Sequence, residues 1–206
     1  MAHNALTEAE RQANWKLLFD GKTLQGWKNT GRPEGWKVSD EAIMCTVQRG
    51  GYIYTEEQFE DFDLSLEFKI APKTNSGIFL RWSDLSDPVN TGLEIQVLDS
   101  FGVETLTTHS CGAIYDLVVP SEHAFKPAGE WNQVLITCDG PLVSVTLNGK
   151  KIAEMDMDKW TQAGLNPDGS KNKFTYAWAD MPRLGHIGLQ DHGGMIWYRN
   201  LKLRPL

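Results

Sequence analysis

Cysteines and long apolar runs are scarce in this sequence, and their scarcity excludes several classes of protein. The 206 residues include three cysteines, Cys45, Cys111 and Cys138, an odd set with neither CxxC spacing nor a disulfide framework. No apolar run is long enough to span a membrane, so we expect no membrane span. Residues 1–15 are polar, so we expect no signal peptide in this stretch, and the compartment stays open.

Positive charge is scarce as well. Lys and Arg number 20 against 27 Asp and Glu, which gives a formal net charge of -7. Binding to a phosphate backbone depends mainly on Lys and Arg, and the sequence has neither a basic run nor a nucleic-acid motif. We therefore expect no nucleic-acid partner. The GxSxG, P-loop, dinucleotide-binding and HExxH motifs are absent too.

Aromatic residues and turn signals, in contrast, are plentiful. The chain has eight Trp, eight Phe and five Tyr, whose rings suit both a core and the stacking of sugar faces. Thr7 and Glu10 have capping-box spacing, which predicts a short N-terminal helix. Turn sequences such as Asn148-Gly149 separate many short segments with alternating apolar residues. This pattern predicts an all-β sandwich or barrel, in one domain over residues 1–206.

The alternation identifies individual strands. Apolar residues recur with a period of two at 64–70, 93–97, 134–138 and 143–147. The last two segments are predicted to form a hairpin, because Asp139-Gly140-Pro141 joins them. Residues 157–183 have no clean period. That stretch is either a functional lid or an ordered crossover whose Trp side chains fill the edge of the core.

The strand at residues 92–99 contains the first candidate site. Its odd-numbered apolar residues face inward, so Glu94 and Gln96 face the other way, and Asp99 follows at the strand end. A carboxylate and an amide side by side can form paired hydrogen bonds to adjacent hydroxyls of a polyhydroxylated ligand. The alternative is a solvated outer face with a cross-strand ion pair.

The preceding strand, residues 75–82, adds to this face. By alternation Phe79 and Arg81 share one face, while Trp82 lies on the other with the apolar residues. If the two strands are neighbours, Arg81 meets Glu94 or Gln96. Phe79 could then cover the apolar face of a sugar.

A second cluster occupies residues 186–194. Its apolar residues are predicted to be buried, so His186 and Gln190 should face outward. Asp191 and His192 lie where this strand runs into a Gly-Gly turn. A carboxylate beside an imidazole can make a base that titrates near neutral pH or a pair of metal ligands. The alternative is a turn whose Asp caps backbone amides.

The loop over residues 99–115, which follows the strand at 92–99, holds His109, and we expect this residue at the rim of the same pocket. Cys111 lies two residues away, and a free thiol near an imidazole raises a thiol nucleophile as a further alternative. No motif provides the rest of a triad for it.

Eight segments in order resemble the domain-of-unknown-function 1080 family, also called the 3-keto-disaccharide hydrolases. They span about residues 15–206 and are Leu18–Trp27, Asn75–Arg81, Glu94–Asp99, Gly112–Tyr115, Gly129–Asn132, Leu147–Gly149, Gly188–Gly193 and Arg199–Leu201. The resemblance implies a concanavalin A-like jelly-roll β-sandwich with a sugar site on its concave face. It also implies action on glycosides that a partner oxidoreductase has already oxidised at C3, and a periplasmic or secreted location.

Members of this family hydrolyse 3-keto-glycosides or catalyse the lyase or hydratase half-steps. The ketone acidifies the C2 proton, so a general base can start β-elimination of the C1 oxygen, and water then adds back. The polar positions that match the family in this chain are Arg81, Glu94, Gln96, Asp99, Asp191 and His192.

The resemblance suggests roles for these residues. We expect His192 to be the base, oriented by Asp191, with Glu94 as the alternative base or the acid for the leaving group. Arg81 and Gln96 would bind the ketone or nearby hydroxyls. A divalent ion such as calcium, held by Glu94, Asp99 or His192, is the alternative electrophile. Further substrate contacts are expected from Asp99, Phe79, His109 and Gln190.

Three other functions stay open. A non-catalytic carbohydrate-binding module would present an open aromatic face with no perturbed acid or base. An adhesion domain would expose an apolar patch. An ordinary glycosidase would need two carboxylates across the bond, but Glu94 and Asp99 are roughly 17 Å apart along an extended strand. The crowding of charged and His residues at one end favours the enzyme.

Overall fold

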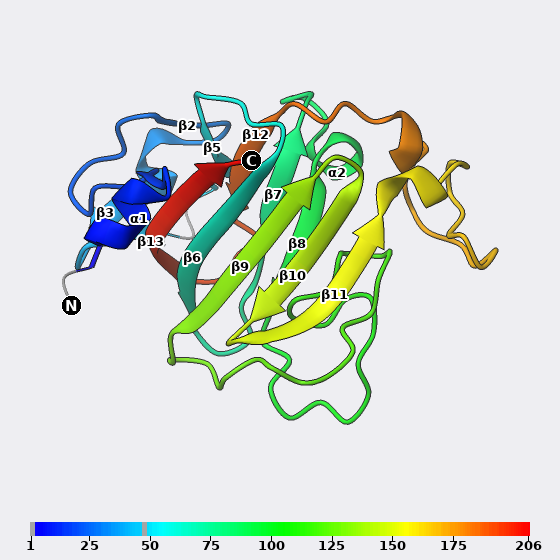
Figure 1. Ribbon diagram of the computed structural model, residues 1–206. Helices are drawn as coiled ribbons and strands as arrows, with labels where there is room; N and C mark the ends of the chain where they lie inside the picture. Colours follow the sequence, from blue (N-terminus) through cyan, green and yellow to red (C-terminus); the bar gives the residue numbers. More distant parts are fainter. Residues whose placement is uncertain (1–2, 47–48) are drawn as a thin grey trace.

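The computed structural model describes residues 3–46 and 49–206, which form two β-sheets packed face to face (Figure 1). The larger sheet contains β1 (Lys16–Leu17), β3 (Trp36–Ser39), β4 (Ala42–Cys45), β6 (Phe62–Ile70), β9 (Asn132–Asp139), β10 (Leu142–Leu147), β11 (Lys150–Asp156) and β13 (Ile196–Pro205). The smaller sheet contains β2 (Trp27–Asn29), β5 (Tyr52–Thr55), β7 (Asn75–Trp82), β8 (Leu93–Leu98) and β12 (His186–Gln190).

The strand order confirms the predicted jelly-roll β-sandwich. It runs β11-β10-β9-β6-β13-β4-β3 in the larger sheet, with β1 paired to β13, and β2-β5-β12-β7-β8 in the smaller sheet. All pairings are antiparallel among the described strands. The predicted hairpin is β9–β10, in which Leu142 pairs with Asp139 across a two-residue turn.

Helices are short and few. They are α1 (Glu8–Gln12), α2 (Pro88–Thr91) and the 3-10 turns η1 (Pro33–Gly35), η2 (Met157–Lys159) and η3 (Trp178–Asp180). The predicted capping box starts α1, because Thr7 Oγ1 accepts from Glu10 N–H at 3.2 Å and Glu10 Oε2 accepts from Thr7 N–H at 2.7 Å. No helix within the described ranges has the length and apolar character needed to cross a bilayer.

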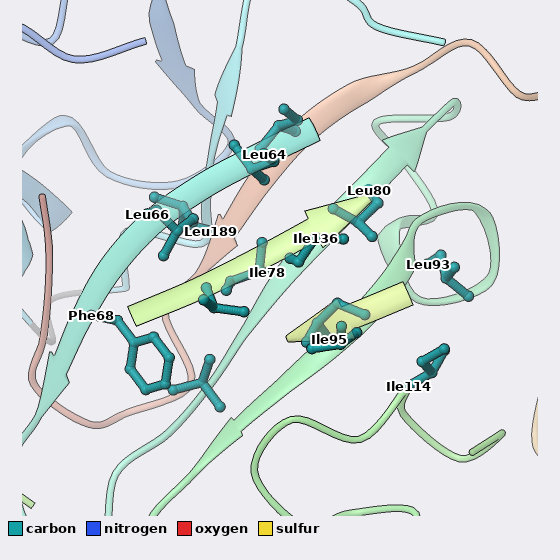
Figure 2. Packing of buried hydrophobic residues seen from close by; sticks show 14 of the residues in the cluster. Leu64, Leu66, Phe68, Ile78, Leu80, Leu93, Ile95, Ile114, Ile136 and Leu189 are labelled. Carbon is teal, nitrogen blue, oxygen red and sulfur yellow. The ribbon is translucent and has the colours of Figure 1, made fainter. Parts of the chain in front are cut away.

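The core lies between the two sheets (Figure 2). Inward residues of the larger sheet, such as Leu64 and Ile136, face inward residues of the smaller sheet, such as Ile78 and Ile95. Each fully buried side chain of this kind contributes roughly 2 kcal/mol of transfer free energy. Because Ile95 and its odd-numbered neighbours on β8 point into this core, Glu94 must point to the outer face of the smaller sheet.

The alternation breaks near the end of β7. Gly188 of β12 pairs with Phe79, but His186 pairs with Trp82, so two residues of β7 lie opposite one residue of β12. Arg81 has a φ of 50° at this β-bulge. The extra residue shifts the alternation, so Phe79 and Trp82 share the outer face, with ring centroids 6.3 Å apart. The expectation that Arg81 shares a face with Phe79, and that Trp82 does not, is therefore wrong.

Arg81 turns toward the larger sheet and is buried. Its Nε donates to the carbonyl of Glu60 (2.7 Å), its Nη1 to the carbonyl of Gly140 (2.7 Å) and its Nη2 to Asp61 Oδ1 (2.8 Å). Nη1 also lies 3.8 Å from Met157 Sδ. These bonds tie the bulge to the β9–β10 turn. Arg81 is thus a structural residue and not, as expected, a substrate contact, because the protein itself occupies its guanidinium.

Residues 157–183, called here the crossover segment, are ordered and run between β11 and β12 (Figure 1). Trp160 and Trp178 are buried in the core cluster. The indole nitrogen of Trp160 donates to Asn166 Oδ1 at 2.9 Å, which closes the segment on itself. The interpretation of this stretch as an ordered crossover whose Trp side chains fill the core edge is confirmed.

Replacement of Arg81 by Met should lower the free energy of unfolding by about 3 kcal/mol, because two carbonyls and a carboxylate lose a charged hydrogen-bond donor. Urea denaturation at pH 7 measures this loss. Arg32→Met, at an exposed arginine, is the matched control and should change stability by less than about 0.5 kcal/mol. A loss below about 1 kcal/mol for Arg81→Met would contradict the structural role.

Candidate functional site

A cavity of about 140 Å³ opens on the outer face of the smaller sheet. It draws residues from β5, β7, β8, β12 and α2, from the loop before β9, and from the crossover segment. Its lining consists of Tyr52, Asn75, Val89, Glu94, Gln96, Tyr115, Lys173, Gln190 and His192. The structure therefore brings together four residues that the sequence predicted for a site, namely Glu94, Gln96, Gln190 and His192.

The floor of the cavity depends on two glycines in neighbouring strands. Gly77 pairs with Gln96, and a Cβ atom at Gly77 would overlap the carboxylate of Glu94. A Cβ atom at Gly188 would come within 3.0 Å of the Trp82 ring. Because neither glycine has a side chain, the carboxylate and the indole ring lie over the sheet instead of being pushed away from it.

Glu94 is the buried acid of the cavity, with 9% of its surface exposed. Burial raises its pKa from 4.5 to about 7, and the positive charge of Lys173 opposes this rise. With its amide turned over, Gln96 donates to Glu94 Oε1 (3.3 Å) and to the carbonyl of Ser76 (3.1 Å). A carboxyl group that titrates near neutral pH is suited to take up and return a proton.

His192 lies on the exposed side of the cavity. Its Nδ1 lies 3.3 Å from the side-chain amide nitrogen of Asn75, within hydrogen-bond distance. Gln190 is buried, and its Nε2 donates to the hydroxyl of Tyr52 at 3.2 Å. The cavity thus offers an imidazole ring and several amide groups around one buried carboxyl.

The carboxylate of Asp191 accepts hydrogen bonds from backbone amides and not from the imidazole of His192 beside it. Its Oδ2 accepts from the N–H of Gly50 (2.9 Å), and its Oδ1 accepts from the N–H of Gly193 (3.1 Å). Its own N–H donates to the carbonyl of Gly51 at 2.8 Å. The expectation that Asp191 orients His192 is wrong, because both carboxylate oxygens face backbone amides. Asp191 is the cap of the turn after β12.

Two other expected contacts lie outside the cavity. Phe79 is fully buried under Tyr52, whose ring meets it edge-on with centroids 5.0 Å apart. Asp99 Oδ2 accepts from the backbone N–H of Lys73 at 2.7 Å and so holds the turn before β7. Neither residue lines the cavity. Both are structural, which corrects their assignment as substrate contacts.

His109 reaches the cavity only through its neighbours. Its ring lies 4.8 Å from the ring of Tyr115, and its Nε2 lies 3.2 Å from Asp116 Oδ1. His109 therefore supports the rim and does not line the cavity, contrary to the expected substrate contact. Burial raises the pKa of Cys111 to about 12, so this thiol is protonated at neutral pH and is a poor nucleophile.

The residues expected to hold a metal ion do not fit one. Glu94 and His192 line the same cavity, but the carboxylate of Asp99 is bound outside it. Over residues 3–46 and 49–206, no three His, Cys, Asp or Glu side chains gather as a set of ligands. Calcium needs about six to eight oxygen ligands.

Sequence reasoning missed five residues that line the cavity, namely Tyr52, Asn75, Val89, Tyr115 and Lys173. Tyr52 lies in the alternating segment of β5, so the argument that identified Glu94 would have found it as well. Tyr115 lies in the irregular stretch between β8 and β9, where alternation gives no signal. Lys173 lies in the crossover segment, whose sequence has no period, so no local signal could place it.

The sequence matches the 3-keto-alpha-glucoside-1,2-lyase-like domain over residues 14–204. The protein belongs to this family. The match confirms the resemblance carried by the eight segments. A relative, the 3-keto-disaccharide hydrolase of Bacteroides thetaiotaomicron, is 26% identical across 92% of this chain and 77% of its own.

Solved structures agree with this assignment. A protein from Parabacteroides distasonis described as a glycosyl hydrolase is 38% identical and has a TM-score of 0.85, covering 93% of this chain and 99% of its own. The carbohydrate-binding module CBM66 of Bacillus subtilis has a TM-score of 0.52 at 14% identity, over 86% of this chain and 94% of its own. That second likeness concerns the fold alone. The family and its named relative indicate a glycosyl hydrolase-like function.

Replacement of Glu94 by Gln should change stability in a pH-dependent way. The native pKa of about 7 exceeds the ordinary value of 4.5, so the protonated carboxyl stabilises the native state below pH 4.5, and this contribution is lost as the pH rises through 7. The free energy of unfolding of Glu94→Gln, measured relative to that of wild type, should therefore be about 2–3 kcal/mol higher at pH 8 than at pH 4.

Denaturation curves at both pH values measure this difference. Glu130→Gln, at an exposed glutamate, is the matched control, and its difference in stability from wild type should be the same at pH 4 and pH 8. An equal effect of Glu94→Gln at the two pH values would show that the native carboxyl titrates in the ordinary range.

Proposed function

We propose that this protein cleaves or processes 3-keto-glycosides by base-assisted β-elimination followed by addition of water. The observation that carries the proposal is Glu94, a buried carboxyl with a pKa of about 7 in a cavity lined by amide groups. Membership of the 3-keto-alpha-glucoside-1,2-lyase-like family supports a keto sugar as the substrate. Glu94 replaces His192 as the proposed base, because Asp191 does not assist the imidazole.

The reaction starts when Glu94 removes the proton from C2. The electrons of the C2–H bond form a C2–C3 double bond, and the ketone oxygen takes the negative charge. When the ketone forms again, a C1–C2 double bond appears, the C1–O bond breaks, and the leaving oxygen takes a proton. Addition of water across the C1–C2 double bond then gives the free 3-keto sugar. A protein that stops before this addition is a lyase, and one that completes it is a hydrolase.

The other lining residues receive supporting roles. The imidazole of His192, which lines the exposed side of the cavity, is proposed to act in its protonated form and to donate a proton to the leaving oxygen. Gln96 and Gln190 are proposed to bind ring hydroxyls through their amides. The substrate carries a ketone, so an oxidoreductase that oxidises the C3 hydroxyl must precede this protein, and we propose such an enzyme as its functional partner. That pairing places both in one compartment, proposed to be periplasmic or extracellular.

A carbohydrate-binding module is the second candidate, because CBM66 shares the fold. A binding module needs hydrogen bonds and ring contacts, but it has no use for a carboxyl whose charge burial suppresses at neutral pH. A glycosidase without ketone assistance needs two carboxylates. Among the described residues that line the cavity, Glu94 is the sole acid. Ketone-assisted elimination therefore accounts for Glu94 better than either alternative.

Release of nitrophenol from 4-nitrophenyl 3-keto-glucoside tests this function. Glu94→Gln should lower kcat by about 10³-fold, since the base is lost while the side-chain shape is kept. Glu130→Gln should leave kcat unchanged. The unoxidised 4-nitrophenyl glucoside should not react with either protein. Equal release from both glucosides, or a near-normal rate for Glu94→Gln, would overturn the proposal.

Replacement of His192 by Ala should have an effect that depends on the leaving group. A nitrophenolate leaves without a proton, so its release should slow less than about threefold, whereas methyl 3-keto-glucoside should react about 10²-fold more slowly. Chromatography of the released sugar compares the two substrates under the same conditions. Equal losses for both leaving groups would remove His192 from the role of general acid.

A further inference from the structure

Lys173 brings a positive charge to the rim of the cavity from the crossover segment. Its Nζ lies 4.1 Å from the centre of the Tyr115 ring, which is a cation–π distance. Within the described part of the chain, no ion pair includes Lys173. Its charge nevertheless acts on Glu94, whose pKa it lowers. The ammonium therefore faces the same space as the buried carboxyl.

The backbone around Lys173 is held from two sides. Its N–H donates to Asp116 Oδ2 at 2.8 Å, while the other oxygen of Asp116 lies 3.2 Å from His109 Nε2. Two residues further on, the N–H of Thr175 donates to Asn90 Oδ1 of α2 at 3.1 Å. These bonds fix the part of the crossover segment that passes the cavity.

We infer that the Lys173 ammonium is the electrophile that stabilises the C3 oxygen when Glu94 removes the C2 proton, and that Asp116 is the residue that positions it. This inference rests on the proposed function. As the C2–H electrons move into the C2–C3 bond, the ketone oxygen becomes an enolate oxygen, which accepts a hydrogen bond from the ammonium. Lys173 keeps its proton throughout, and its charge is balanced by the enolate.

The other lining groups suit this role less well. Gln96 and Gln190 are neutral donors, and Gln190 already donates to Tyr52. A hydrogen bond from a charged donor is roughly twice as strong as one from a neutral donor. Charge that develops in the transition state is best stabilised by a donor already in place. Lys173 is the cationic donor that lines the cavity, and its ammonium contacts the Tyr115 ring without an ion-pair partner among the described residues.

The first experiment compares three variants in the nitrophenol assay and in exchange of the C2 proton of 3-keto-glucose in D2O. Lys173→Met should slow both reactions by about 10²-fold, because removal of one such donor costs that much. Lys173→Arg keeps the charge and should retain more than about a tenth of the rate, since the guanidinium differs in shape. Lys171→Met, at an exposed lysine two residues away, is the control and should match wild type.

The pH dependence gives a readout that a merely structural role would not move. In wild type, kcat/KM should rise with a midpoint near pH 7 as Glu94 ionises. Without the cation, ionisation of Glu94 is harder, so the midpoint should move to higher pH in Lys173→Met but not in Lys173→Arg. An unmoved midpoint together with a wild-type rate for Lys173→Met overturns the role of Lys173.

The role of Asp116 is tested by combining its substitution with Lys173→Met and asking whether the two losses of rate add. Asp116→Asn should slow wild type by about tenfold, yet have no further effect in the Lys173→Met background, because its contribution passes through Lys173. Additive losses would overturn its positioning role. If wild type converts neither keto compound, the proposed function itself fails. If wild type is active and Lys173→Met equals Lys171→Met, only the inference about Lys173 fails.

Discussion

The burial of one carboxyl group, that of Glu94, is the constraint on which the candidate site depends. The side chain lies over a sheet at a point where the neighbouring strand has no Cβ atom, since Gly77 is directly beneath it. Away from water the ionised carboxylate is poorly solvated, so the neutral form persists up to about pH 7. The proton affinity of the site is therefore set by backbone geometry and access of water more than by any ion pair.

A layer of rings on the outer face of the smaller sheet keeps water from this region. Tyr52 contacts both Phe79 and Trp82, with centroids 5.0 and 5.2 Å apart, and Tyr54 contacts Trp82 at 5.6 Å. Trp82 reaches this layer only because the bulge at Arg81 shifts the alternation of β7. One extra residue thus provides both the ring that covers Gly188 and the guanidinium that ties the sheet to the β9–β10 turn.

Alternation predicted much of the fold and a third of the residues that line the cavity, because the period of a strand depends only on neighbouring residues. Glu94, Gln96 and Gln190 were found in this way. The method failed at Arg81, since a bulge is decided by pairing with another strand and leaves no mark on the period. It failed for Asp191 because the atoms that compete for a carboxylate, here the N–H groups of Gly50 and Gly193, belong partly to a distant segment.

Lys173 shows a different limit of prediction. The crossover segment is irregular between its two buried indoles, so its path across the cavity is set by bonds to Asp116 and Asn90, far away in sequence. The lining residues that lie on regular strands could be predicted. The wall of the cavity that the irregular crossover segment forms could not. Tertiary contacts alone decide where such a segment lies.

The attachment of the crossover segment also bears on how this scaffold can be redesigned. Trp160 and Trp178 fill the core at either end of its middle portion, and the residues between them add little to the sandwich beyond Phe174. Loop exchange between these two tryptophans would change the wall of the cavity while the sheets that carry the buried acid stay as they are. The fold thus separates a floor that the sheets fix from a wall of irregular chain, and any variation of that wall would have to keep Lys173 and its backbone bond to Asp116.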